Sequence, residues 1–451
     1  MPGKYVKKRT FSPILLLIAA AVVLILLAVV LLPDKEVPEQ TQPVEQTTQP
    51  TETTVPPEHK IIAATARFTV TGDLLMHLPV IESCWSSEKG EWIFDPIFTY
   101  VAPYIQQADY AVANLETTLR GENDTYPYQG NPLFNCPDGI ASASKAAGFD
   151  MLLTGNNHCY DTRVEGVVRT LEVVAQAGLE SLGTQLSKDD PDHKVIEVNG
   201  IKVGMTAYTF ETSDGLPDVP SINAIRCRSN VLGMINSFDG GQLNKFYSEI
   251  GSQFEAMKAE GAEVIVVYMH WGDEYQLEPT KHQKKIAQKL CDMGVDVIIG
   301  GHPHVVQPAD LLTSTEDENH KTLIIYSTGN AVSNQRIAEM DMKSGHTEDG
   351  ILFHFTLARY IDGTVGLLET SCTPTWVYME GYQQRYTILP LEYRQMDQWQ
   401  ELFGIDEDTY NACVNSYRRT MLLVYDGLEK AQNWCDEQLS AKFALPGDSV
   451  Q

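Results

Sequence analysis

Histidines in this chain gather at the ends of short apolar runs. Of the 11 histidines, five lie at or just after such runs: His77, His158, His270, His302 and His304. In an open α/β sheet, the loops at the carboxyl ends of strands build the active site. A single histidine in such a loop is more often a hydrogen-bonded structural residue than a ligand, so the set carries more weight than any one member.

Carboxylates and carboxamides accompany the histidines in the same segments. They are Asp73, Asn114, Glu116, Asn156, Asn157, Asp161, Glu274 and Asn330. Such a mixture of oxygen and imidazole ligands suits divalent ions such as Mn²⁺, Zn²⁺ or Fe²⁺. Two ions about 3.5–4 Å apart, bridged by a carboxylate, can promote in-line attack on a phosphoester. The pattern therefore indicates metal-assisted hydrolysis at one or two divalent ions.

The Gly-Gly-His-Pro-His segment at residues 300–304 is the sharpest of these motifs. Gly300 and Gly301 are expected to let the backbone turn tightly at the end of a strand. Pro303 restricts the backbone between two imidazoles at positions i and i+2. We expect His302 and His304 to face different ions.

Short β-branched runs alternate with amphipathic stretches from residue 63 onward. Strands are expected at residues 68–71, 110–113, 151–154, 203–208, 264–269, 295–299 and 323–326, with helical stretches at 164–177 and 254–260. Buried strands alternating with helices predict an α/β layered fold. Residues from about 406 onward read as one or two helices packed on that domain.

The ordered motifs GDxxxH, NLE, NNHxxD, HWGxE, GGHPH and YSxGN resemble those of the capsule-synthesis protein CapA family, also called poly-γ-glutamate synthesis proteins. The resemblance runs from about residue 67 to 357, with a continuation to about 391. It implies a fold similar to the calcineurin-like metallophosphoesterases, a four-layer α/β/β/α sandwich. It also implies a role in producing an extracellular polymer, without naming a bond that is hydrolysed.

The same resemblance implies a set of metal ligands. Asp73 would bind the first ion with His304, Glu116 would replace the bridging aspartate, and the second ion would be held by Asn157, His270 and His302. Two departures leave alternatives open. The phosphoesterases carry Asp-x-His in their first motif, whereas His77 follows Asp73 by four residues, so its contact with the first ion is open. Glu116 is one methylene longer than aspartate, so two ions, one or none remain alternatives.

A proton donor is also implied. His158 would act as the general acid that protonates a leaving oxygen, and Asp161 or another acid would orient it. Glu274, Trp271 and Asn330 occupy motif positions to which no role is assigned.

The amino-terminal residues predict a membrane anchor. Residues 14–32 are 19 uninterrupted apolar residues, close to the roughly 20 needed to span a bilayer core. A cleaved signal peptide is the alternative, but its apolar region is usually about 7–15 residues with a small-residue cleavage site. Four basic residues within positions 1–10 place the amino terminus in the cytoplasm and the remainder outside the cell.

Five parts are expected along the chain. They are a cytoplasmic segment (1–13), the anchor (14–32), an extracellular tether (33–60), a CapA-like metallophosphoesterase-fold domain (61–395) and a carboxyl-terminal helical extension (396–451). The tether holds six Pro, six Thr, five Glu and four Gln among 28 residues, the composition of a solvated spacer.

Charge limits the class of partner. The formal net charge is −27, from 33 basic and 60 acidic residues, which disfavours nucleic acid. The expected partners are the membrane, an anionic cell-surface polymer or its phosphorylated precursor, and a membrane synthase complex. Two functions remain: a metal-dependent hydrolase, or an accessory component that guides the polymer outward. A polyanion would need a metal or a local basic groove under either one.

Overall fold

The computed structural model describes residues 61–212, 219–341, 343–381 and 384–443. The expected anchor at 14–32 and tether at 33–60 lie outside these ranges, so both stay predictions. Within the described ranges, no helix combines the length and the apolar character that crossing a membrane requires.

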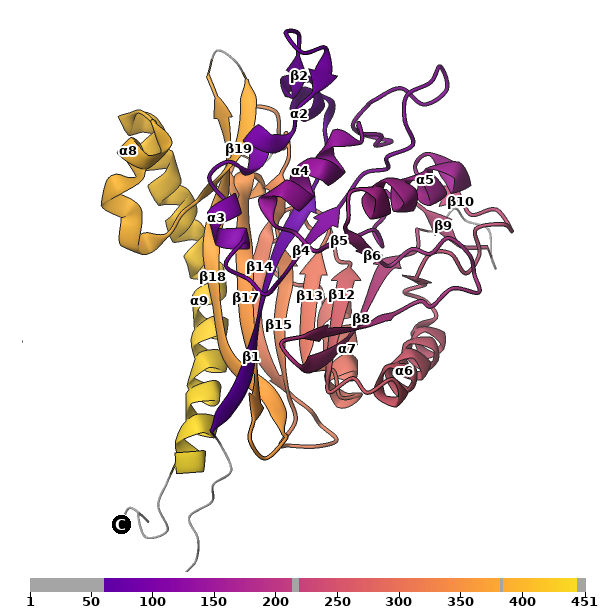
Figure 1. Ribbon diagram of the computed structural model, residues 1–451, viewed down its shortest axis with the longest axis vertical. Helices are drawn as coiled ribbons and strands as arrows, with labels where there is room; N and C mark the ends of the chain where they lie inside the picture. Colours follow the sequence, from indigo (N-terminus) through magenta and orange to yellow (C-terminus); the bar gives the residue numbers. More distant parts are fainter. Residues whose placement is uncertain (1–60, 213–218, 342, 382–383, 444–451) are drawn as a thin grey trace, which may run out of the picture. The chain divides into compact units, whose positions relative to one another are not determined.

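The first sheet has the strand order β19-β18-β17-β1-β4-β5-β6 (Figure 1), and β16 also pairs with β1. Its strands are β1 (Ile62–Leu74), β4 (Tyr110–Leu115), β5 (Met151–Leu153), β6 (Glu180–Leu182), β16 (Asn330–Val332), β17 (Asp349–Tyr360), β18 (Val365–Glu380) and β19 (Arg385–Pro390). Strands β1, β4, β5 and β6 run parallel, so their carboxyl ends share one edge. Strands β17, β18 and β19 extend the other side of β1 in antiparallel pairs.

The second sheet has the order β11-β8-β12-β13-β15-β14, with β7 paired to β8. Its strands are β7 (Lys194–Val198), β8 (Ile201–Phe210), β11 (Ser237–Phe238), β12 (Val264–His270), β13 (Val297–Gly301), β14 (Val306–Thr313) and β15 (Lys321–Thr328). The central strands β8, β12, β13 and β15 are parallel. Two short hairpins, β2–β3 (Trp85–Ser86, Glu91–Trp92) and β9–β10 (Ser221–Ile222, Ile225–Arg226), lie outside the large sheets.

Side chains that point alternately to the two faces of the central strands form the cores between the layers. In β12, Val264, Val266 and Tyr268 belong to the core shared with the first sheet. Ile265 and Val267 belong to a second core on the opposite face, shared with helices. Because successive strand side chains point to opposite faces, a continuous apolar run of this kind suits a strand covered on both sides.

Helices cover the outer faces of the two sheets. Residues of α4 (Gly139–Ala147) and α5 (Arg163–Gln176) pack on the first sheet, and residues of α6 (Leu243–Ala259) and α7 (Lys281–Asp292) pack on the second (Figure 1). The remaining helical elements are α2 (Leu78–Ser83), η1 (Asp95–Phe98), α3 (Ala102–Ile105), η2 (His346–Glu348), η3 (Tyr393–Gln398), α8 (Trp399–Phe403) and α9 (Glu407–Phe443). The described residues thus form helix, sheet, sheet and helix layers, and the expected mixed α/β class is confirmed.

The carboxyl-terminal helix α9 contributes to the core between the sheets. Val424, Leu428 and Ala431 lie in that core, and the helix runs along β14 and β18 (Figure 1). A Cβ at Gly427 would lie 1.8 Å from the carbonyl oxygen of Ala309 in β14, so the helix approaches this strand as closely as only glycine allows.

Two features differ from the expectations. Helix α6 begins at Leu243, eleven residues before the expected helical stretch at 254–260, since polar positions dilute the apolar pattern of its first turns. The antiparallel strands β17, β18 and β19 were not among the expected strands. Ten of the 16 residues of β18 are exposed or half-buried, so it lacks the continuous apolar run that marks the buried strands.

Candidate metal centre

The predicted ligands come from strand ends that the two sheets bring together. In the first sheet, Asp73 lies at the end of β1, Glu116 directly follows β4, and Asn157 follows β5. In the second sheet, His270 ends β12, and His302 and His304 follow β13. Parallel neighbours deliver their carboxyl ends to one edge. Since the sheets pack face to face, these two edges form one site.

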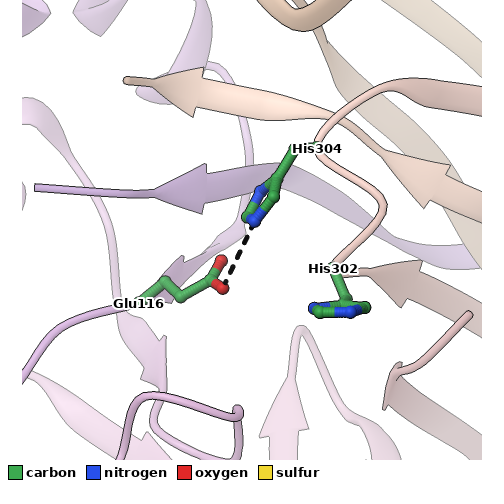
Figure 2. Close-up of side chains that lie close together, drawn as sticks. All are labelled: Glu116, His302 and His304. Carbon is green, nitrogen blue, oxygen red and sulfur yellow. Dashed lines mark ion pairs between the residues drawn. The ribbon is translucent and has the colours of Figure 1, made fainter. Parts of the chain in front are cut away.

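Two groups of side chains bring their ligand atoms within 4.8 Å of one another. One is Glu116, His302 and His304, shown in Figure 2, and the other is Asp73, Glu116 and His270. Glu116 belongs to both groups, which fits the bridging position that the sequence suggests for it. The grouping places His302 with His304, whereas the expected assignment sends these imidazoles to different ions.

Short distances connect the members of these groups. His270 Nε2 lies 3.4 Å from Glu116 Oε1, and His304 Nε2 lies 3.9 Å from the same oxygen. His304 Nδ1 lies 3.2 Å from Asp73 Oδ2. Asn157 Oδ1 lies 2.8 Å from His270 Nε2, so Asn157 also reaches this cluster.

Unpaired buried atoms show that these residues fit a cation. Glu116 Oε1 and His302 Nδ1 are buried and have no hydrogen-bond partner among the residues that the structure describes, and the buried Asp73 Oδ2 faces His304 Nδ1 at 3.2 Å. An unsatisfied buried polar group destabilises the fold by about 1–3 kcal/mol, and a charged group by more. Divalent ions held at the two ligand groups would supply partners to these atoms, and the combination of carboxylate, carboxamide and imidazole suits Mn²⁺, Zn²⁺ or Fe²⁺.

Mutual charge sets the ionisation of the cluster. Burial alone would raise the pKa of Asp73, but the hydrogen bond and charge of His304 and the charge of His270 hold it below its ordinary value. Burial alone would lower the pKa of His304, but Glu116 and Asp73 raise it to about 9. Burial and the charges of His270 and His304 lower the pKa of His302. Metal ions bind ionised carboxylates and neutral imidazoles, which are the forms that these shifts favour for Asp73 and His302.

His77 lies outside both ligand groups. The backbone N–H of Asn334 donates to its Nδ1 over 3.3 Å, and its ring meets Phe134 edge-on at 5.2 Å. Burial and the charge of His304 lower the pKa of His77 to about 4. The structure therefore presents His77 as a neutral neighbour of the cluster.

The proposed proton donor is held by two residues. His158 Nδ1 lies 2.8 Å from Asp161 Oδ2, and Asn223 Nδ2 donates to Asp161 Oδ1 over 2.8 Å. Burial alone would lower the pKa of His158, but the charge and hydrogen bond of Asp161 and the charge of Glu116 raise it above its ordinary value. A protonated imidazole of this kind can serve as a general acid.

The Gly-Gly-His-Pro-His segment turns later than expected. Gly300 and Gly301 remain in β13, where a Cβ at Gly300 would lie 1.9 Å from Tyr326 O. Glycine is therefore required at position 300 because the backbone of Tyr326 approaches it closely, and not because the chain turns there. The left-handed residues are His302 and His304, with φ of 96° and 56°. Such a conformation destabilises a non-glycine residue by about 1–3 kcal/mol and persists only where surrounding contacts enforce it.

Sequence reasoning missed Asn223 as a site residue. It lies in the turn between β9 and β10 with φ of 50°, and Ala224 follows with φ of 55°. Asparagine tolerates left-handed turns, so a turn at this position was predictable, but its contact with Asp161 was not. Trp271, which also lies in one of the motifs, is a packing residue: it is buried, and its indole N–H donates to Tyr326 O over 3.0 Å.

Comparison with known families matches most of this domain. The sequence profile described as "Bacterial capsule synthesis protein PGA_cap" matches residues 67–335, which include every predicted ligand and Asn330. Helix α9 lies beyond the matched residues.

Curated relatives agree with that match. The "PGA biosynthesis protein CapA" of Bacillus subtilis is 27% identical over 58% of this chain and 62% of its own length. The "Capsule biosynthesis protein CapA" of Bacillus anthracis is 28% identical over 59% of each chain. A "Probable polyglutamine synthesis accessory protein" of Mycobacterium tuberculosis is 25% identical over 45% of this chain and 52% of its own length. The chain therefore spans about six tenths or less of these relatives.

Proposed function

This chain belongs to the bacterial capsule synthesis protein family, and from that premise we propose that it is a membrane-anchored, extracellular protein of capsule or poly-γ-glutamate biosynthesis or export that carries a divalent-metal hydrolase site. The convergence of Asp73, Glu116, His270, His302 and His304 on shared, unpaired ligand atoms carries the proposal. The resemblance of the sequence motifs to a family with a metallophosphoesterase-like fold supports the same reaction class, and the layered α/β architecture agrees with it.

The proposed chemistry divides between the ions and the chain. A bound divalent ion lowers the pKa of water and polarises a phosphoryl or carbonyl oxygen. The protonated His158 would donate its proton to the leaving oxygen, since Asp161 holds Nδ1 and leaves Nε2 for the substrate. Asn223 fixes Asp161 by its hydrogen bond to the second carboxylate oxygen.

The proposed substrate is an anionic cell-surface polymer or its phosphorylated precursor. A strongly acidic chain repels such a molecule at long range, so attraction must come from a metal or a local basic groove, and the proposed metal centre would supply it. The anchor at 14–32 and the spacer at 33–60 would hold the domain outside the membrane, where a membrane synthase complex delivers the polymer.

Metal analysis and a chelator test this proposal. The purified protein is analysed for bound Mn, Zn and Fe, and phosphodiester and γ-glutamyl substrates are assayed with and without the chelator. We expect bound metal and chelator-sensitive turnover. Loss of His158 by His158→Ala should lower turnover by about 10²–10⁴-fold while metal content stays the same. Absence of both metal and chelator-sensitive turnover would rule the hydrolase out.

An accessory role is the second candidate. The Mycobacterium tuberculosis relative is itself named an accessory protein of polymer synthesis. Under this role the domain would guide the polymer within a synthesis complex without breaking a bond. Polymer production in cells separates the two. If His158→Ala supports production as well as the control His193→Ala, while deletion abolishes it, the accessory role holds.

A metallophosphoesterase that acts on another cell-surface substrate is a further alternative within the hydrolase class. Chelator-sensitive phosphodiesterase turnover in a protein whose deletion leaves polymer production unchanged would favour it.

A further inference from the structure

Asn330 contacts both the ring and the backbone of His304. Its Nδ2 donates to the carbonyl oxygen of His304 over 3.3 Å, and its Oδ1 lies 3.1 Å from His304 Nδ1. Asn330 is fully buried at the start of β16, where it pairs in register with Asp73 of β1. A single side chain therefore holds a predicted ligand at two points.

The orientation of the Asn330 amide is fixed by its other partners. Nδ2 also lies 3.0 Å from the carbonyl oxygen of Thr347 and 2.9 Å from Gln335 Oε1. Backbone carbonyl oxygens only accept hydrogen bonds, so the amide nitrogen must face them. Oδ1 is then the atom that faces His304, and an oxygen can only accept, so His304 Nδ1 must carry the proton.

In the neutral ring that metal binding requires, a proton on Nδ1 leaves Nε2 of His304 as the atom with a free lone pair. Nε2 is the ring atom that lies 3.9 Å from Glu116 Oε1 (Figure 2). The imidazole therefore directs its lone pair at the ligand group formed by Glu116, His302 and His304.

The backbone conformation of His304 gives a second, independent reason why the contact from Asn330 is needed. His304 has φ of 56°, a left-handed conformation that a residue with a Cβ avoids unless its surroundings enforce it. The bond from Asn330 to the His304 carbonyl is one such constraint. Thr347, which accepts from the same amide, lies in η2 beside Asp349, and Arg419 of α9 pairs with Asp349. The support therefore reaches beyond the residues that the family profile matches.

We infer that Asn330 is a positioning residue that orients His304 for metal binding through its Oδ1 and stabilises the surrounding loop through its Nδ2. The inference rests on the proposed metal centre and assigns a role to the last residue of the YSxGN motif. Because the two atoms do different work, substitutions can separate metal affinity from stability.

Isothermal titration of the full chain with Mn²⁺, together with thermal melting of the metal-free protein, tests the inference. Asn330→Ala removes both atoms and should weaken Mn²⁺ binding by about 10–100-fold, the usual effect of losing the partner of a metal-bound histidine. Asn330→Asp keeps the acceptor and loses the donor. We expect its affinity to stay close to wild type while its melting temperature falls.

A control separates the hydrogen bond from the added charge of Asn330→Asp. The double variant Asn330→Ala with Gln335→Glu places a carboxylate nearby, at a residue that bonds Asn330 and Tyr275. We expect it to bind Mn²⁺ as weakly as Asn330→Ala alone. The inference would be overturned if the double variant bound Mn²⁺ as tightly as Asn330→Asp does. It would also be overturned if Asn330→Ala bound Mn²⁺ with wild-type affinity. Absence of Mn²⁺ binding by the wild type would instead overturn the metal centre itself.

Discussion

Oε1 of Glu116 lies 3.4 Å from Nε2 of His270, so a carboxylate from the first sheet meets an imidazole from the second with no hydrogen-bonded neighbour in the described chain to satisfy that oxygen. Glu116 follows β4 and His270 ends β12, so this contact joins the edges of both sheets. The same oxygen belongs to both groups of ligand atoms. Glu116 is therefore the side chain on which the two groups depend in common.

Removal of Glu116 should abolish more metal binding than removal of a histidine. Glu116→Gln takes the shared charge from both groups, so we expect the bound Mn²⁺ per chain to fall to near zero. His270→Ala or His302→Ala disturbs one group each and should leave about half of the metal, since the other group keeps its shared carboxylate. Elemental analysis after incubation with Mn²⁺ and desalting measures this.

Glu263→Gln is the matched control, because Glu263 is a partly exposed carboxylate paired with Arg359. It should retain the wild-type metal content. Equal metal loss in Glu116→Gln and His270→Ala would contradict a shared bridging carboxylate.

The charge of Asp161 should set the alkaline limb of the pH–rate profile. Asp161 raises the pKa of His158, and a general acid works only when protonated, so turnover is lost as pH rises through that pKa. Asp161→Asn removes the charge, so the pKa falls and the alkaline limb moves to lower pH. Turnover measured across pH 6–9 with constant Mn²⁺ shows the shift.

Asp189→Asn removes an acid from an exposed loop and provides the comparison for this experiment. Its profile should coincide with that of the wild type. An alkaline limb that stays in place in Asp161→Asn would mean that another group supplies the proton.

The buried strands and the ligand set were predictable from sequence because each leaves a local signal. Central strands such as β12 and β13 are covered on both faces and read as continuous apolar runs. Polar residues that end such runs are conspicuous, which explains why Asp73, Glu116 and His270 could be named before the fold was known. Their meeting follows from parallel strands that share an edge.

Contacts made across long sequence separations were beyond the reach of local patterns. Asn223 bonds Asp161 from a hairpin 62 residues later, and Asn330 bonds His304 from another strand. His77 lies at the N-cap of α2, directly after β1, and this position leaves it outside both ligand groups. Asn223 does not differ in sequence from an ordinary turn residue, and the motifs that hold His77 and Asn330 do not indicate which atoms these side chains contact, so only tertiary packing reveals the contacts.

Burial of His354 should make the protein sensitive to acid. This imidazole in β17 bonds Thr69 of β1 and Thr373 of β18, and burial lowers its pKa from 6.5 to about 3. Between those values the unfolded chain binds a proton that the folded chain does not, so stability falls as pH drops below 6.5. The loss amounts to about 1.4 kcal/mol per pH unit, or roughly 2 kcal/mol at pH 5.

Comparison with His354→Asn isolates this group. Urea unfolding at pH 7.5 and pH 5, with chelator present so that metal binding does not change, gives the free energy of unfolding of both proteins. The variant loses packing and should be less stable at pH 7.5, yet its stability should change less between the two pH values. An identical pH dependence would show that His354 is protonated in the folded state.

The ion pair between the half-buried Arg419 and the buried Asp349 should anchor helix α9 to the domain. Arg419 Nη2 donates to Asp349 Oδ1 over 2.6 Å, and Ser416 donates to the same oxygen. Arg419→Ala leaves a buried carboxylate without its cation, which typically destabilises a protein by about 3–5 kcal/mol. By contrast, Lys430→Ala removes a surface pair between α9 and Asp310 and should change stability by less than about 1 kcal/mol.

The pH dependence of the Arg419→Ala effect follows from Asp349. Burial raises the pKa of Asp349 to about 6 even beside Arg419, and loss of the guanidinium should raise it further. The folded variant then holds a proton that the unfolded chain releases, so its stability falls as pH rises from 5 to 8. Urea unfolding should therefore show a larger loss at pH 8 than at pH 5. Addition of Asp349→Asn to Arg419→Ala should restore much of the stability at pH 8, because no buried charge remains. If the double variant stays as unstable as Arg419→Ala, the guanidinium stabilises α9 by packing and not by its charge.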